Sequence, residues 1–189
     1  MSSFYSEEEL AEVGFASIGA NSFISRKCSI YMAERIHIGS HVRIDDFCII
    51  SGEVRLGDYI HIGAGSFIFG GETGVIIDDF SSLSSRCVIY AESDDFFGDA
   101  LGNPTVPNQF RKVSGARVVI GKYVSVGTGS TILPGATIEE GVSVGAMSLV
   151  NRSLKEWGLY AGIHPCKRIL DLERTVVDKA GIVKAEHSQ

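Results

Sequence analysis

The chain has 189 residues, with 17 lysines and arginines against 23 aspartates and glutamates, so its formal net charge is −6. This length allows one domain with a real core, and a hydrophobic content of 44% excludes a disordered chain. The acidic balance excludes an extended basic surface for nucleic acid, and no apolar run is long enough to predict a membrane span.

The apolar residues are biased toward β-branched types. The chain has 20 isoleucines and 17 valines but only 10 leucines, together with 22 glycines. This composition is typical of strands joined by tight turns, and it argues against a helical bundle or a coiled coil.

Residues 1–17 predict an N-terminal helical cap. Ser6 and Glu9 have the spacing of a capping box, and Leu10 and Val13 follow as apolar helix positions. Three consecutive glutamates after Ser6 do not fit a signal peptide. The four cysteines have neither CxxC nor zinc-site spacing, so we expect a cytoplasmic protein with reduced thiols.

Residues 18–152 carry a repeat of six. An aliphatic residue recurs at 19 positions in four runs, from Ile18 to Ile36, from Ile38 to Ile68, from Ile77 to Ile89 and from Ile120 to Val150. Glycine often follows it, and a small or β-branched residue stands four positions after it. A six-residue unit is one short strand plus a corner, so three units predict one triangular coil, and stacked coils bury the aliphatic residues.

Two segments depart from the repeat. Residues 90–117 form a protruding loop between coils, and a long unphased loop in a regular solenoid suggests function. Residues 153–189 are a C-terminal tail, for which we expect a short helical turn near Leu154–Trp157, an extended stretch and a charged helix.

The stretch from Ile120 to Ile138 resembles the hexapeptide-repeat acyltransferases, most of all the xenobiotic, maltose and galactoside acetyltransferase group. The segment from Ala161 to Arg168 is similar to the end of the repeat in that group. The resemblance implies an all-β, left-handed parallel β-helix that works as a homotrimer with active sites between subunits. It implies transfer of acetyl from acetyl-CoA to a hydroxyl or amine of a sugar or nucleotide-linked sugar, in surface polysaccharide synthesis. The residues it implies for binding acetyl-CoA are Gly127, Thr128, Ala146, Asn151, Arg152, Lys167 and Arg168.

The expected base is missing. The resembling family has a histidine a few residues after the strand that precedes the loop, and this chain has Asp94 there, with no histidine in the loop. A solvated aspartate is a weak base for a hydroxyl, but a neutral amine attacks a thioester before it loses its proton. We therefore predict Asp94, with Asp95 second, as the base or acceptor-positioning group, and Asn103 and Thr105 as acceptor contacts. A loop-capping role for the aspartates is the open alternative.

Two other functions stay open at this point. A non-catalytic β-helix that binds a ligand would explain the missing histidine. A zinc lyase of the γ-carbonic-anhydrase kind would use His37, His41 and His61, but their spacing does not match that family, and no metal site is predicted.

Overall fold

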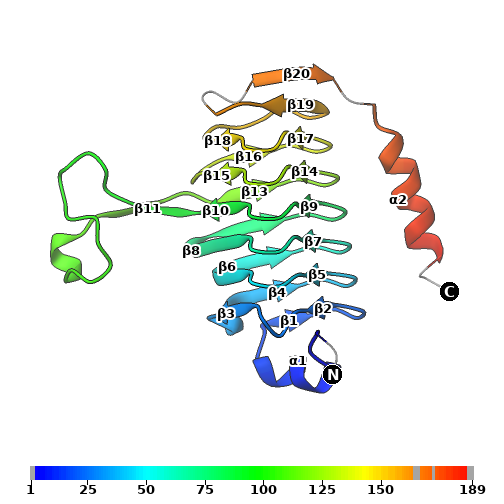
Figure 1. Cartoon of the computed structure of the whole chain (residues 1–189), viewed down its shortest axis with the longest axis horizontal. Helices are drawn as coiled ribbons and strands as arrows, with labels where there is room; N and C mark the ends of the chain where they lie inside the picture. The colour runs from blue at the N-terminus through cyan, green and yellow to red at the C-terminus, as the bar shows by residue number, and fades with distance from the viewer. Residues whose placement is uncertain (1–2, 164–166, 172, 187–189) are drawn as a thin grey trace.

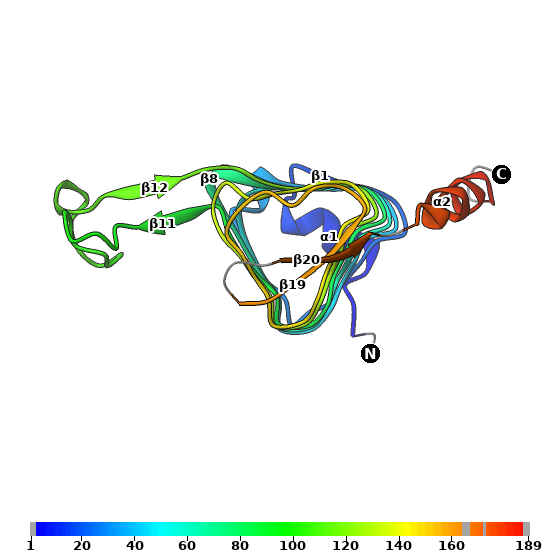
Figure 2. The same ribbon diagram turned by 90° about the horizontal axis from the view of Figure 1, so that it is seen from above.

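The computed structural model describes residues 3–163, 167–171 and 173–186. Short strands stack along one axis from the N-terminus to the C-terminus, and the coil they form has a triangular cross-section (Figures 1 and 2). An arm leaves one corner of the triangle, and the C-terminal helix lies beyond another (Figure 2). The predicted parallel β-helix is confirmed.

Three faces run the length of the stack. The first face carries β3 (Ser29–Tyr31), β10 (Val88–Tyr90), β15 (Thr131–Ile132), β18 (Leu149–Val150) and the first halves of two long strands, β6 (Ile49–Leu56) and β8 (Phe67–Ile77). The second face carries the other halves of β6 and β8 with β1 (Ser17–Ile18), β4 (Ile36–Ile38), β13 (Val118–Ile120) and β16 (Thr137–Ile138).

The third face forms a separate sheet. It carries β2 (Phe23–Ile24), β5 (Arg43–Ile44), β7 (His61–Ile62), β9 (Ser82–Leu83), β14 (Ser125–Val126), β17 (Ser143–Val144) and β19 (Gly158–Ala161), and it ends with β20 (Lys167–Asp171), which pairs antiparallel. A 3-10 turn, η1 (Ala33–Arg35), precedes β4.

The aliphatic repeat forms the core. Seventeen of the 19 repeat positions are buried, and the two exceptions, Ile18 and Ile30, pack against the core in the first coil. The pairing is in register from coil to coil, as with Ile44, Ile62 and Leu83. Each coil therefore covers the apolar face of the next, which is how a solenoid gains its stability.

Serines and cysteines at several small positions of the repeat are buried donors. Ser66 donates to the Ser84 carbonyl, the Cys87 thiol to the Gly127 carbonyl and Ser130 to the Gly145 carbonyl. Each of these bonds satisfies a corner carbonyl in the next coil that the strand ladder does not reach. The sequence predicted these residues as space fillers, and their hydrogen-bonding role is an addition.

Both ends of the stack are covered. The helix α1 (Glu7–Val13) begins at the predicted capping box, in which the side chains and backbone N–H groups of Ser6 and Glu9 bond reciprocally. At the other end, the predicted helical turn at Leu154–Trp157 is wrong. Leu154 bridges Ile138 in parallel and β19 joins the third face, so the coil continues past residue 152. The helix α2 (Thr175–Glu186) is the last element that the structure describes.

Candidate active site

The arm between β10 and β13 is built on a short antiparallel ladder. Its strands are β11 (Glu92–Asp94) and β12 (Val113–Gly115), and a 3-10 turn, η2 (Asn108–Phe110), lies in the loop between them. The ladder is fixed to the β-helix at a bulge of β8. The Glu92 carboxylate accepts a 2.6 Å hydrogen bond from the Glu72 backbone, and the Thr73 hydroxyl donates to the Ala91 carbonyl. The residues that follow Glu92 are thereby held in place.

Gly71 lies at this junction, against the Glu92 side chain. Gly71 has φ +53°, and a Cβ there would lie 2.2 Å from the Glu92 carboxyl carbon. A side chain at this position would displace the Glu92 carboxylate from its hydrogen bond with the Glu72 backbone.

Asp94 is held by one of its two oxygens. Arg111, which precedes β12, donates from Nη2 to Asp94 Oδ1 at 3.1 Å, and both side chains are largely buried, at 18% and 26% exposed. No residue in the described ranges donates to Asp94 Oδ2. The carboxylate is thus oriented and keeps one oxygen for another partner.

Asp95 has no such freedom. One of its oxygens accepts from the Phe97 backbone, and the other accepts from the backbones of Asp99 and Ala100. These hydrogen bonds hold the Asp95 pKa below its ordinary value, so the group is a poor proton acceptor. The geometry favours the loop-capping alternative for Asp95.

Asp94 opens onto a hollow beside the arm, of about 910 Å³. We call it the arm groove, and its lining residues are Phe69, Glu72, Tyr90, Glu92, Ser93, Asp94, Asn108, Arg111 and Val113. Tyr90 stacks on Phe69 with ring centroids 5.2 Å apart, which gives the groove an aromatic wall. Its three carboxylates face the guanidinium of Arg111, and a second guanidinium, that of Arg35, neutralises Glu72 from outside the groove. One negative charge remains in excess, so the groove suits a cationic or amine-bearing ligand.

The predicted acceptor contacts lie further out on the arm. The Asn103 side chain accepts from both the backbone and the hydroxyl of Thr105, and both residues are exposed. This arrangement is a local Asx turn. Neither residue lines the arm groove.

The first group of predicted cofactor residues meets at a different corner, between the third and first faces. Thr128 donates a 2.6 Å hydrogen bond to the Ser85 carbonyl, and the backbone of Ala146 lies directly beside Gly127. We call this the Thr128 corner. Ser84 and Ser85 are exposed there, one coil below Thr128. Sequence reasoning did not select these serines, although their place one coil before Gly127 and Thr128 in the repeat was a usable signal.

The other predicted cofactor residues are dispersed. Asn151 and Arg152 are exposed after β18, at the corner from which the arm also leaves. Lys167 begins β20 and is exposed.

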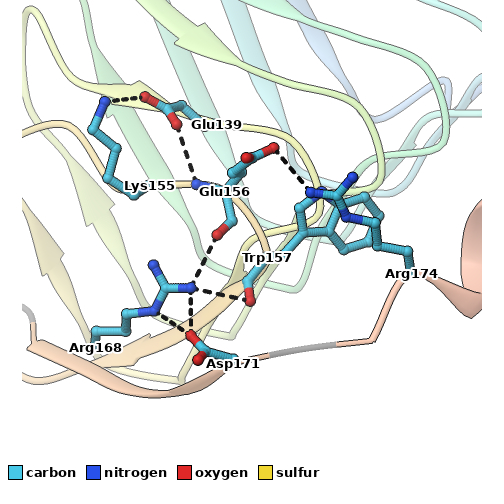
Figure 3. A pocket seen from close by; sticks show the side chains of 7 residues that line it. All are labelled: Glu139, Lys155, Glu156, Trp157, Arg168, Asp171 and Arg174. Atoms are coloured by element: carbon cyan, nitrogen blue, oxygen red, sulfur yellow. Dashed lines mark hydrogen bonds and ion pairs between the residues drawn. The ribbon is translucent and has the colours of Figure 1, made fainter.

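Arg168 is committed to a structural network. Its guanidinium donates to Asp171 and to the carbonyls of Glu156 and Trp157 (Figure 3). It also donates to the Tyr160 hydroxyl. In the surrounding pocket the other two cations are also paired, Lys155 with Glu139 and Arg174 with Glu156. A cation whose donors are occupied is a weak phosphate ligand, so the geometry disfavours the predicted contact of Arg168 with CoA.

Of the three histidines considered for a zinc site, His41 and His61 line one hollow, and His37 does not line it. His37 pairs with Ser17 on the second face, His41 stacks on Tyr59 at a corner, and His61 bonds to Asp45 on the third face. The described residues hold no cluster of three possible metal ligands.

No helix in the described part of the chain is long and apolar enough to cross a membrane.

The structure therefore places the predicted base and the Thr128 corner apart. Asp94 and the arm groove lie at one edge of the first face, and the Thr128 corner lies at its other edge. In a single chain they do not meet.

Comparisons with known proteins agree with this architecture. Residues 35–70 and 117–152 match the family described as bacterial transferase hexapeptide (six repeats). The chain is 37% identical over 184 residues to a dTDP-4-amino-4,6-dideoxy-D-glucose acyltransferase of Escherichia coli, covering 96% of this chain and 95% of the relative.

Solved structures of AntD, an N-acyltransferase from Bacillus cereus, are similar over the whole chain. The complex with dTDP and 3-hydroxybutyryl-CoA superposes with a TM-score of 0.95 at 46% identity, covering 100% of both chains. The D94A variant of AntD was solved with dTDP and coenzyme A, and it has a TM-score of 0.93 at 47% identity, covering 98% of this chain and 100% of that one. The S84A variant was solved with dTDP-4-amino-4,6-dideoxyglucose and coenzyme A, with a TM-score of 0.94 at 47% identity over the same shares.

Proposed function

The chain belongs to the bacterial transferase hexapeptide family and is an acyl-CoA-dependent sugar acyltransferase. On this basis we propose that it acylates the amino group of a nucleotide-linked amino sugar. Asp94 is the proton acceptor. The observation that carries the proposal is the Asp94 carboxylate, which is fixed through Oδ1 and open at Oδ2 in an acidic groove without a histidine. The likeness to acyltransferases over nearly the whole chain supports an acyltransferase over a non-catalytic β-helix and over a zinc lyase.

The chemistry fits an amine better than a hydroxyl. The neutral amine adds to the thioester carbonyl, the carbon–sulfur bond breaks, and CoA leaves as a thiolate. The nitrogen then carries an extra proton, which Asp94 takes and which ends on the CoA sulfur or in solvent. A carboxylate can accept that proton because a protonated amine bonded to an acyl carbon is far more acidic than a hydroxyl.

The relatives support this assignment. The E. coli relative acts on a dTDP-linked amino sugar, and AntD binds the same kind of sugar nucleotide. AntD variants were made at an aspartate numbered 94 and a serine numbered 84, and this chain has the same residue types at both numbers. We accordingly add Ser84 to the Thr128 corner as a substrate contact and take that corner, with Gly127 and Ala146, as the acyl-CoA site.

We also propose that the active enzyme is a homotrimer. The first face has an apolar exterior, because side chains that alternate with the core point outward from it. They are Ile49, Phe67, Phe69, Val88, Tyr90, Leu133 and Leu149, all at least partly exposed in the single chain. When three copies turn this face toward a threefold axis, the arm edge of each meets the Thr128 edge of the next. Asp94 of one copy then faces the acyl-CoA of its neighbour.

The cell compartment follows from the substrates. Nucleotide-linked sugars and acyl-CoA are cytoplasmic metabolites, and the buried cysteines Cys28, Cys48 and Cys87 are free thiols. We place the enzyme in the cytoplasm, where its product would supply surface polysaccharide synthesis.

Release of the CoA thiol over a panel of acceptors tests the proposal. With acetyl-CoA or 3-hydroxybutyryl-CoA, we expect release with dTDP-4-amino-4,6-dideoxyglucose and none with the matching 4-hydroxy sugar nucleotide. Asp94→Asn should lower kcat on the amino sugar, and Asp99→Asn, an exposed arm carboxylate, should not. Equal rates on the hydroxyl sugar, or an unchanged kcat in Asp94→Asn, would disprove the assignment.

A further inference from the structure

The guanidinium of Arg111 lines the arm groove and has no part in the proposed chemistry so far. It comes from the returning side of the arm, whereas Asp94 comes from the outgoing side, and β11 pairs Asp94 with Val113, two residues after Arg111. The ion pair therefore crosses the two sides of the arm where the ladder ends and the loop begins.

This ion pair differs from two other arginine–carboxylate pairs in the chain, each of which is held by two hydrogen bonds. Arg26 binds both oxygens of Glu9, and Arg35 binds both oxygens of Glu72. Such forked contacts give the most stable arginine–carboxylate geometry. Arg111 gives one N–H to one oxygen of Asp94, and its buried Nε has no partner among the described residues.

We infer that Arg111 is a positioning residue for acyl transfer, which orients the Asp94 carboxylate and leaves Oδ2 directed at the acceptor amine. The inference rests on the proposed function, because it assigns Arg111 a part in the step that Asp94 performs. A contact with two hydrogen bonds would occupy both carboxylate oxygens, and without any contact the Asp94 side chain would be free to rotate. The single hydrogen bond fixes the side chain and leaves one oxygen available. Positional errors of about 1 Å in a reacting group can cost ~100-fold in rate.

Steady-state kinetics with acetyl-CoA and dTDP-4-amino-4,6-dideoxyglucose would test this role. Arg111→Gln should lower kcat by about 10- to 100-fold, as expected for a misplaced proton acceptor, with KM for acetyl-CoA unchanged within about twofold. Arg111→Lys should restore part of kcat, because it keeps a single donor. Lys112→Gln is the matched control, since Lys112 is the next residue, is exposed and pairs only loosely with Asp99 at 3.8 Å.

A double-mutant cycle separates positioning from other roles. If Arg111 acts through Asp94, then Asp94→Asn with Arg111→Gln should be no slower than Asp94→Asn alone. Losses that add in the double variant, or an effect confined to KM for the sugar nucleotide, would overturn the inference and make Arg111 a direct substrate ligand.

The remaining outcomes are also decisive. If Arg111→Gln does not fold, Arg111→Met replaces it in the same cycle because it also removes the donor, and full activity of the methionine variant in the parent background would then refute an orienting role. If the parent protein acylates no amine, the proposed function fails together with this inference. If the parent acylates the amine and Arg111→Gln is equally fast, only the inference fails.

Discussion

The hydroxyl of Thr128 donates a hydrogen bond of 2.6 Å to the backbone carbonyl of Ser85, although 43 residues separate the two in the sequence. The bond joins consecutive coils on either side of the arm insertion. It places a site residue predicted from the sequence directly beside two serines that were not predicted.

Replacing Thr128 with valine should weaken acyl-CoA binding. The variant keeps the shape of the side chain but loses the hydrogen bond to the Ser85 carbonyl. A hydrogen bond is worth about 1 kcal/mol, and this corresponds to ~5-fold in CoA affinity when binding requires the intact geometry of the corner. Isothermal titration with CoA would measure the change. Thr137→Val, on the second face, is the control. Equal affinities for the two variants would contradict a binding role for the Thr128 corner.

Replacing Ser130 with alanine should destabilise the coil. The Ser130 hydroxyl donates to the Gly145 carbonyl and accepts from the Ser148 backbone. The Gly145 carbonyl keeps a second bond from the Ser148 hydroxyl, so the loss leaves the Ser148 N–H unpaired at a cost of about 1–3 kcal/mol. Ser130→Cys should cost less, because Cys48 and Cys87 make the equivalent bond in other coils. Chemical denaturation of both variants would check this, and similar losses would argue that the small position only fills space.

The N-terminal cap should loosen in acid. The hydrogen bonds from Arg26 lower the Glu9 pKa from 4.5 to about 2. Since the folded-state pKa is depressed, this pair stabilises the docked helix above pH about 4.5 and loses that effect as the pH falls toward 2. Arg26→Gln should therefore lower the melting temperature at pH 7, with a difference from the parent that disappears near pH 2. Arg86→Gln, at an exposed corner, should show no such trend, and a constant difference for Arg26→Gln would refute the linkage.

A charge on the apolar first face should dissociate the proposed trimer. Val88→Lys puts an ammonium into the expected interface, where burying it without a partner costs several kcal/mol. Val119→Lys places the same charge at an outward position of the second face and should leave the assembly intact. Sedimentation velocity would compare the two. A trimer that survives Val88→Lys but not Val119→Lys would move the interface to the second face.

The sequence alone determined the β-helix and its core. Every coil repeats the same local solution, an inward aliphatic residue followed by a corner, so the pattern can be read without knowing which coils touch. Ile44 and Ile62 are buried for the same reason, and the capping box of Ser6 and Glu9 depends only on neighbours in the chain. The position of Asp94 could also be identified, because it stands where a related family has its base.

Only the tertiary structure decided what the site residues can do. It distinguished Asp94 from Asp95, because both carboxylate oxygens of Asp95 accept hydrogen bonds from the described residues and only one of Asp94 does. It also showed that Arg111 pairs with Asp94 across the arm, and that the guanidinium of Arg168 binds neighbouring residues of the fold. It also extended the coil past residue 152, where Trp157 occupies a corner at φ +54° instead of a helical turn. Such roles depend on partners contributed by other strands and coils, and a repeat of six residues carries no information about which side chains will meet across that distance.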